Sequence, residues 1–217
     1  MILAAGRGER LRPISDTVPK ALMQVKGEYL LDRHLRMLKD AGVDTVIINL
    51  GWLGEQIVDH VGSGAKFGVN VVYSPEYDQA LETGGGIHRA LPMLGSGPFW
   101  VVNSDVYTDM ALPENALAED EDAYLVLVPT PAHKTKSDFG FLDSKVCFTD
   151  NPDCTYSGIA LYRPSFFKCV EGGRFSVAPM LFEAARDKRL GASLFTGLWE
   201  DVGTPERLRE LNERNRG

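Results

Sequence analysis

The feature that most constrains the fold is an alternation of short apolar runs with segments of helical spacing. The apolar runs occupy residues 1–5, 45–50, 69–75 and 98–105. Between them, apolar residues recur every three or four positions over residues 28–41 and again through Ile57 and Val61, and a further helix is expected near Gly84. Strands that are apolar on both faces and separated by helices are typical of a parallel sheet with helices on both sides.

The second half of the chain is less regular. Strand-like segments occupy residues 124–130, 139–143, 145–148 and 155–162, and helical patterns cover residues 180–190 and 204–215. No Pro/Ser-rich linker, low-complexity run or internal repeat divides the 217 residues. We therefore expect one α/β domain of Rossmann-like type. Its sheet is mixed but mostly parallel, with helices on both faces and a small hairpin extension.

Charge and cysteine content exclude several classes of protein. The net charge of -7 argues against broad nucleic-acid binding, which requires a basic face. The three cysteines are odd in number and form no CxxC pair, which favours a reducing compartment. No apolar stretch approaches the roughly 18 residues of a membrane span, and the start does not read as a signal peptide. We expect a cytoplasmic protein that binds neither membrane nor nucleic acid.

The first apolar run opens into a glycine loop that carries three arginines. Gly6 and Gly8 permit a backbone that turns its N–H groups toward a phosphate, and Arg10 can place a guanidinium on phosphate oxygens. The dinucleotide fingerprint fails because Leu11 stands at its third glycine, and the P-loop pattern is absent. The alternative is a plain glycine turn beside solvated arginines. Arg7 and Arg12 fit that description better than Arg10.

Two aspartates follow strand-like segments at positions where ligands of parallel sheets bind. Asp105 closes the run at residues 98–105, and Asp201 precedes a Gly-Thr-Pro turn. Two carboxylates suit Mg²⁺, which completes its shell with water and substrate phosphates. The alternative for Asp105 is a capping or turn residue. For Asp201 the turn explanation is stronger, although it accounts for Thr204 and Pro205 and not for the aspartate itself.

Two further features, a glycine run and a lysine, are weak evidence for a binding site unless other site residues accompany them. The glycine run within residues 81–87 is interpreted as a connection between a strand and a helix, whose open backbone groups could read a nucleobase. A flexible turn is the alternative. Lys20 lies after a proline that restricts the loop, and by itself a solvated lysine is the simpler explanation.

The chain lacks the patterns of covalent catalysis. It contains no G-x-S-x-G elbow and no Cys/His arrangement, and the four histidines show no metal-ligand spacing. This absence is informative, because a reaction whose nucleophile is already an anion needs no general base.

Taken in order, these residues resemble the signature of the sugar-phosphate nucleotidyltransferase family. The motif G-x-G-x-R-L-x-P is present as Gly6, Gly8, Arg10, Leu11 and Pro13, and the P-K element as Pro19 and Lys20. Ala21 departs from the second proline of many relatives. The base-binding glycine segment is similar to residues 82–86, and the two metal aspartates match Asp105 and Asp201. The resemblance runs essentially end to end.

The resemblance implies an enzyme that transfers a nucleotidyl group from a nucleoside triphosphate to a sugar 1-phosphate and releases pyrophosphate. Residues 1–110 would be mainly the nucleotide-binding half, and residues 111–217 mainly the sugar-phosphate half. The implied catalytic residues are Arg10 and Lys20, and the implied nucleotide-binding residues are Ala5, Gly6, Gly8, Glu82, Thr83 and Gly84. The implied sugar-phosphate residues are Asn103, Asp138, Phe139, Gly140, Ser157 and Gly158, and Asp105 with Asp201 would hold Mg²⁺.

Within the family, the segments LAAGRGERLRP and DVGTPERL are most similar to short members that use UTP and N-acetylmuramate 1-phosphate in peptidoglycan recycling. Guanylyl transfer to mannose 1-phosphate, uridylyl or thymidylyl transfer to glucose 1-phosphate, and transfer to phosphocholine remain alternatives. A regulatory subunit that binds sugar nucleotides without turnover is the alternative from another class. A substrate carboxylate would favour a basic residue near the sugar loops, for which Lys134, Lys136 and Arg163 are candidates. The chain is expected to be a monomer or a homodimer.

Overall fold

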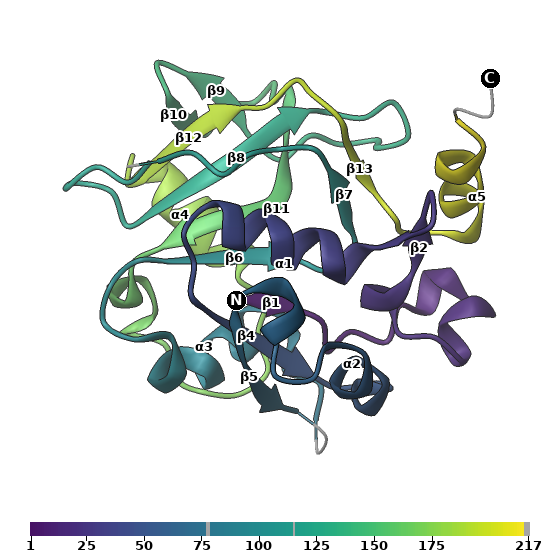
Figure 1. The fold of residues 1–217 in the computed structure, drawn as a ribbon. Helices are drawn as coiled ribbons and strands as arrows, with labels where there is room; N and C mark the ends of the chain where they lie inside the picture. Colours follow the sequence, from purple (N-terminus) through teal and green to yellow (C-terminus); the bar gives the residue numbers. More distant parts are fainter. Residues whose placement is uncertain (77–78, 115, 215–217) are drawn as a thin grey trace.

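A mixed nine-stranded sheet organises the molecule (Figure 1). The computed structural model describes residues 1–76, 79–114 and 116–214. Seven of the nine strands point in one direction, and β11 and β10 run opposite to them. In spatial order the strands are β5 (Asn70–Pro75), β4 (Thr45–Leu50), β1 (Ile2–Leu3), β6 (Phe99–Asn103), β11 (Cys154–Tyr162), β8 (Ala123–Pro129), β12 (Leu190–Leu194), β10 (Lys145–Cys147) and β9 (Gly140–Leu142).

Helices cover both faces of this sheet, because the side chains of its buried strands are apolar on both sides. Val46 and Ile48 of β4 pack toward α1 (Leu30–Asp40) and α2 (Gly54–Val61). Ile47, between them, belongs to the core that contains α3 (Glu82–Leu94) and α4 (Ala178–Arg186). Among the described residues, no helix combines the length and apolar character needed to cross a membrane.

A third, smaller core joins the start of the chain to its last helix. Leu11 is fully buried there with Met23, Val25 and Leu211. It contains residues of the small sheet β2–β3 (Gln24–Val25, Glu28–Tyr29), of the small sheet β7–β13 (Val106–Thr108, Trp199–Asp201) and of α5 (Pro205–Glu213). Leu11 of the G-x-G-x-R-L-x-P motif is therefore a packing residue that anchors the glycine loop.

The predicted fold class is confirmed, and β9 with β10 forms the expected hairpin at the end of the sheet. Two predictions were wrong. The helix expected over residues 180–190 ends at Arg186 and is followed by β12. Gly191 and Ser193 weaken the strand pattern of β12 in the sequence, and the strand forms by pairing with β8. The glycine run is not a connecting turn, because Gly84, Gly85 and Gly86 lie inside α3. Asn215, the expected end of the last helix, lies outside the described residues.

Candidate active site

A cavity of about 300 Å³ lies at the carboxyl ends of β1, β4, β5 and β6. The strand register places Leu3 beside both Asn49 and Asn103. Parallel strands that end together leave their last residues around one hollow, where ligands of such sheets bind. Of the predicted residues, the walls contain Ala5, Gly6, Lys20, Glu82, Thr83, Asn103 and Asp105.

The two loop glycines have different tasks. A Cβ built on Gly6 would meet no protein atom within 4 Å, so the space in front of Gly6 is open. Gly8 has a left-handed φ of 66°, and its carbonyl accepts from Leu11 N–H and from Ser15 Oγ, each at 2.8 Å. Gly8 therefore shapes the loop, whereas Gly6 faces the cavity.

The three loop arginines take three directions. Arg7 stacks over the Trp52 ring, with Cζ 4.3 Å from the ring centroid. Arg12 pairs with Asp16 at 3.1 Å on an exposed surface. Arg10 extends toward Gly203, where a Cβ would lie 3.4 Å from Arg10 Nη2 and 3.0 Å from Asp201 Oδ2. Arg10 is thus the loop arginine that lies beside a predicted metal ligand.

Lys20 and Asp105 form an ion pair in the cavity wall. Lys20 begins the short helix η3 (Lys20–Leu22), and its Cβ packs against the position of Gly8. Asp105 follows the end of β6, and the side chains of both residues are at least four-fifths buried. The structure therefore joins the predicted P-K lysine and the predicted metal aspartate in one contact.

Asp201 lies on the strand next to Asp105. Asp201 pairs with Val106 across β13 and β7, and Val202 N–H donates to the Asp105 carbonyl at 2.8 Å. Arg207 Nη1 donates to Asp201 Oδ2 at 2.5 Å. Asp201 Oδ1 is buried without a hydrogen-bond donor among the described residues, although His133 Nε2 lies 3.1 Å away.

These two carboxylates fit a magnesium ion in their chemistry. Mg²⁺ is commonly held by one or two carboxylates together with substrate phosphates and water. The orphan oxygen of Asp201 is a buried acceptor that a cation would satisfy. The described residues contain no cluster of three or more metal-ligating side chains. Substrate phosphates and water would complete the shell.

The start of α3 lines the cavity through Glu82 and Thr83. Thr83 Oγ1 accepts from Val177 N–H at 3.1 Å, and Glu82 pairs with Arg174 at 2.9 Å. Gly84 N–H donates to the Phe175 carbonyl at 3.0 Å. This N–H, which was expected to be free to contact a nucleobase, is therefore already hydrogen-bonded within the protein. Gly84 is a glycine because a Cβ there would lie 2.3 Å from the Phe175 ring. Glu82 and Thr83 reach the cavity, and Gly84 supports them.

Only some of the predicted sugar-phosphate residues lie together near the cavity. Gly158, with φ of 83°, lies against Asn103, whose Nδ2 would be 2.7 Å from a Cβ there. Ser157 is buried, its Oγ accepts from Ile159 N–H at 3.2 Å and its carbonyl accepts from Trp199 Nε1 at 2.9 Å. Asn103 and Gly158 therefore meet at the edge of the cavity through an irregularity in β11.

Residues 138–140 divide between surface and core. Asp138 Oδ2 accepts from Tyr156 N–H at 3.0 Å and lies 3.5 Å from Lys134 Nζ. The Phe139 ring packs in the core 5.0 Å from that of Phe182, and its backbone pairs with Cys154. A Cβ on Gly140 would lie 2.8 Å from Thr149. Only Asp138 of the three has a partly exposed side chain.

Sequence reasoning missed Asn49, Glu76 and Arg207. Asn49 lies at the end of β4 and Glu76 directly after β5, and both line the cavity. The rule that singled out Asp105, a polar residue where an apolar strand ends, applies equally to these two. Arg207 is in the first turn of α5, and no sequence signal connected it with Asp201.

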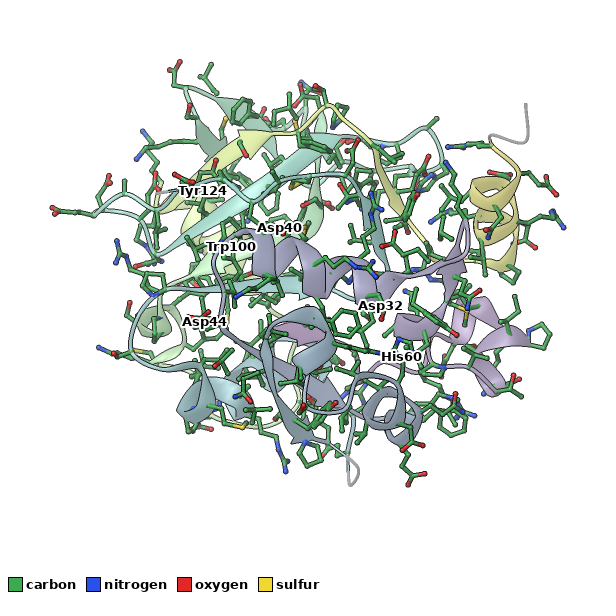
Figure 2. All side chains as sticks on the ribbon, in the orientation of Figure 1. Asp32, Asp40, Asp44, His60, Trp100 and Tyr124 are labelled. Carbon is green, nitrogen blue, oxygen red and sulfur yellow. The ribbon has the colours of Figure 1, made fainter. Side chains whose placement is uncertain are left out.

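A larger hollow of about 950 Å³ lies elsewhere, beside the end of α1 and Trp100 of β6. Figure 2 labels two of its residues, Asp40 and Trp100. None of the predicted site residues lines it. The smaller cavity is therefore the better candidate, because its wall contains both the glycine loop and the Lys20–Asp105 pair.

The comparisons with known proteins point to one family. The family described as nucleotidyl transferase matches residues 1–151. An N-acetylmuramate alpha-1-phosphate uridylyltransferase of Neisseria meningitidis is 47% identical over 97% of this chain and 95% of its own length. A protein of the same name from Caulobacter vibrioides is 35% identical over 95% and 92%.

The solved structures support the fold. The CTP:phosphocholine cytidylyltransferase of Streptococcus pneumoniae superposes with a TM-score of 0.78 and covers 98% of this chain and 96% of its own. Its sequence identity is 22%. At that identity the likeness shows a shared architecture only.

Proposed function

The chain belongs to the nucleotidyl transferase family, and on that premise we propose that it transfers the uridylyl group of UTP to N-acetylmuramate 1-phosphate. Pyrophosphate is the second product. The proposal for these substrates rests on the two uridylyltransferases that match nearly the whole chain. The reaction would serve peptidoglycan recycling in the cytoplasm, carried out by a monomer or a homodimer.

The observation that carries the proposed chemistry is the position of Lys20 and Asp105 between the glycine loop and Asn103. A phosphate oxygen of the sugar 1-phosphate attacks the α-phosphorus in line, and the bond to pyrophosphate breaks. The attacking oxygen is already an anion, so no side chain has to remove a proton. Lys20 holds the mutually repelling phosphates together, and Arg10 neutralises charge on the departing pyrophosphate.

The metal role rests on Asp105 and Asp201. When bound, Mg²⁺ would neutralise part of the negative charge of the substrate phosphates. Asp105 and Asp201 would hold it, and Arg207 keeps the Asp201 carboxylate in its orientation through the 2.5 Å contact. Lys20, which pairs with Asp105 in the structure, would bind the substrate phosphates through its ammonium charge.

We assign the nucleotide side to residues of the cavity wall, and the sugar side to Asn103 and the segments beside it. Ala5, Gly6 and the loop shaped by Gly8 cradle the triphosphate, while Glu82 and Thr83 face the base, supported by Gly84. Asn103 with Ser157, Gly158 and Asp138 borders the sugar phosphate, and Phe139 and Gly140 support that border from the core. Residues 1–110 thus remain the proposed nucleotide half, and residues 111–217 the proposed sugar half.

A substrate carboxylate would be read by the loop that carries Lys134 and Lys136. Lys134 contacts Asp138, and His133 of the same loop lies beside Asp201. Arg163 is a poorer candidate, because its guanidinium donates to the carbonyls of Glu121 and Ala118. The lactyl carboxylate of N-acetylmuramate 1-phosphate is the group that distinguishes it from N-acetylglucosamine 1-phosphate.

A pyrophosphate-release screen tests the proposal. ATP, CTP, GTP, UTP and dTTP are each offered with N-acetylmuramate, N-acetylglucosamine, glucose and mannose 1-phosphates and with phosphocholine. We expect preferential turnover of UTP with N-acetylmuramate 1-phosphate. Dominant turnover of GTP with mannose 1-phosphate would replace this substrate assignment, and binding without any turnover would favour a regulatory subunit.

A further inference from the structure

Two buried polar side chains, Asn49 and Glu76, lie side by side in the wall of the candidate cavity. Asn49 is 3% exposed and Glu76 is 4% exposed. Among the described residues no lysine or arginine pairs with Glu76. An ionised carboxylate in such a place is costly unless hydrogen bonds satisfy it, so its partners should explain its presence.

Asn49 and Glu76 complete a chain of three hydrogen bonds. Ala4 N–H donates to Asn49 Oδ1 at 2.7 Å, and Asn49 Nδ2 donates to Glu76 Oε1 at 2.8 Å. Leu81 N–H then donates to Glu76 Oε2 at 3.2 Å. The chain therefore runs from the residue before Ala5 and Gly6 to the residue before Glu82 and Thr83.

The groups at the two ends of this series of hydrogen bonds explain why one side chain is an amide and the other a carboxylate. The groups at both ends are backbone N–H donors. Each of the two side chains must therefore present an acceptor to its backbone N–H and also form a hydrogen bond with the other side chain. One amide and one carboxylate meet this requirement. Two amides do not, because with Gln at position 76 one contact always sets a donor against a donor.

The absence of a side chain at Gly86 leaves space for Asn49 and Glu76. A Cβ on Gly86 would lie 2.7 Å from Glu76 Oε1 and 2.9 Å from Asn49 Nδ2. Gly86 lies one turn into α3, so the helix approaches the pair closely. The last glycine of the run is thus explained by this pair and not by a ligand.

We infer that Asn49 and Glu76 are positioning residues that fix the spacing between the phosphate loop and the base-facing start of α3. The inference rests on the proposed function, because it assigns those two segments to the triphosphate and the base of one nucleotide. Neither side chain takes part in the chemistry. Loss of the chain of hydrogen bonds should weaken nucleotide binding and leave the sugar-phosphate side almost unchanged.

A reciprocal exchange tests this inference. Glu76→Gln leaves a buried donor unsatisfied, and we expect the UTP dissociation constant to rise about ten-fold. Asn49→Asp with Glu76→Gln restores all three hydrogen bonds with the middle one reversed, and we expect the dissociation constant to return to within about three-fold of wild type. Direct titration with a non-hydrolysable UTP analogue measures binding on folded protein, and thermal unfolding measures stability in parallel.

The outcomes separate this inference from the proposed function. A purely structural pair would lower Tm in Glu76→Gln and leave the dissociation constant unchanged, which would overturn the inference. Failure of the double variant to recover nucleotide binding would overturn it as well, as would a wild-type protein that binds no nucleotide. A KM for sugar 1-phosphate that rises as much as that for UTP would also contradict it. Absence of turnover by a wild type that binds UTP would instead contradict only the proposed function.

Discussion

At the scale of single residues, position decides which charges matter. The three loop arginines lie within six residues of one another, yet each has a different partner. Arg7 stacks on Trp52, and Arg12 forms an ion pair with Asp16. Arg10 reaches Gly203 beside Asp201. The net charge of -7 says nothing about this, because local positive charge is gathered where the first strand ends.

Arg10 and Arg12 form a matched pair for a test, because both are exposed and lie in the same loop. Arg10→Ala should reduce kcat/KM for pyrophosphate release at least about ten-fold, which is about 1.4 kcal/mol of transition-state stabilisation. Arg12→Ala loses only a surface ion pair and should stay within about two-fold of wild type. Equal losses in both variants would show that the loop contributes only general positive potential.

Gly6 and Gly8 should fail in different ways when they are replaced by alanine. Gly6→Ala meets no protein atom, so its Tm should match wild type while the KM for UTP rises. Gly8→Ala must hold a left-handed φ of 66°, which costs about 1–2 kcal/mol, so we expect a lower Tm. Gly97→Ala has open space and lies outside the cavity, and it serves as the control. A Gly6→Ala variant with an unchanged KM for UTP would remove Gly6 from the phosphate site.

At the scale of elements, the sequence predicts strands better than the contacts at their ends. The run TVIINL coincides with β4, because continuous apolar patterning is a property of the segment itself. By contrast, β12 contains Gly191 and Ser193 and is recognisable only beside β8. The same holds for the site: Lys20 was predicted from a motif and Asp105 from its place at the end of an apolar strand. The contact of Arg207 with Asp201 is local, but it comes next to Asp105 only because β13 pairs with β7. Such long-range pairings leave no local signal.

The contact between α1 and β7 gives the fold a dependence on pH. His34 of α1 is fully buried, and its Nε2 lies 2.7 Å from the Val106 carbonyl, so Nε2–H donates. Its Nδ1 has no hydrogen-bond partner in the part of the chain that the structure describes. Burial lowers the pKa of His34 from 6.5 to about 4. The unfolded chain therefore binds a proton that the folded chain does not, and stability falls as pH drops from about 6.5 to about 4.

The size of this effect is about 3.5 kcal/mol at most, from about 1.4 kcal/mol for each unit of pKa difference. Urea unfolding of wild type and His34→Gln at several pH values measures it. Gln at position 34 can still donate to Val106 and carries no titrating group, so its stability should change less over this pH range. Equal slopes in the two proteins would show that His34 does not control the acid sensitivity.

At the scale of the whole molecule, residues from both ends of the chain surround the proposed site. The cavity walls come from residues 3–105, whereas Asp201 and Arg207 arrive from the end of the chain. The third core holds them in place, because Leu11 of the glycine loop packs with Val202 and Leu211. The last helix α5 therefore positions the proposed metal site through packing against the first loop of the chain.

The central claim is that the cavity between Gly6, Lys20 and Asp105 is where nucleotidyl transfer takes place. Its most direct test is Mg²⁺-dependent pyrophosphate release by Asp105→Asn, with Asp44→Asn as the control, since the Asp44 side chain is 92% exposed and remote from the cavity. We predict that a folded Asp105→Asn variant loses at least about 100-fold in kcat at every magnesium concentration while the control keeps wild-type activity. Wild-type turnover by the folded Asp105→Asn variant would contradict the claim.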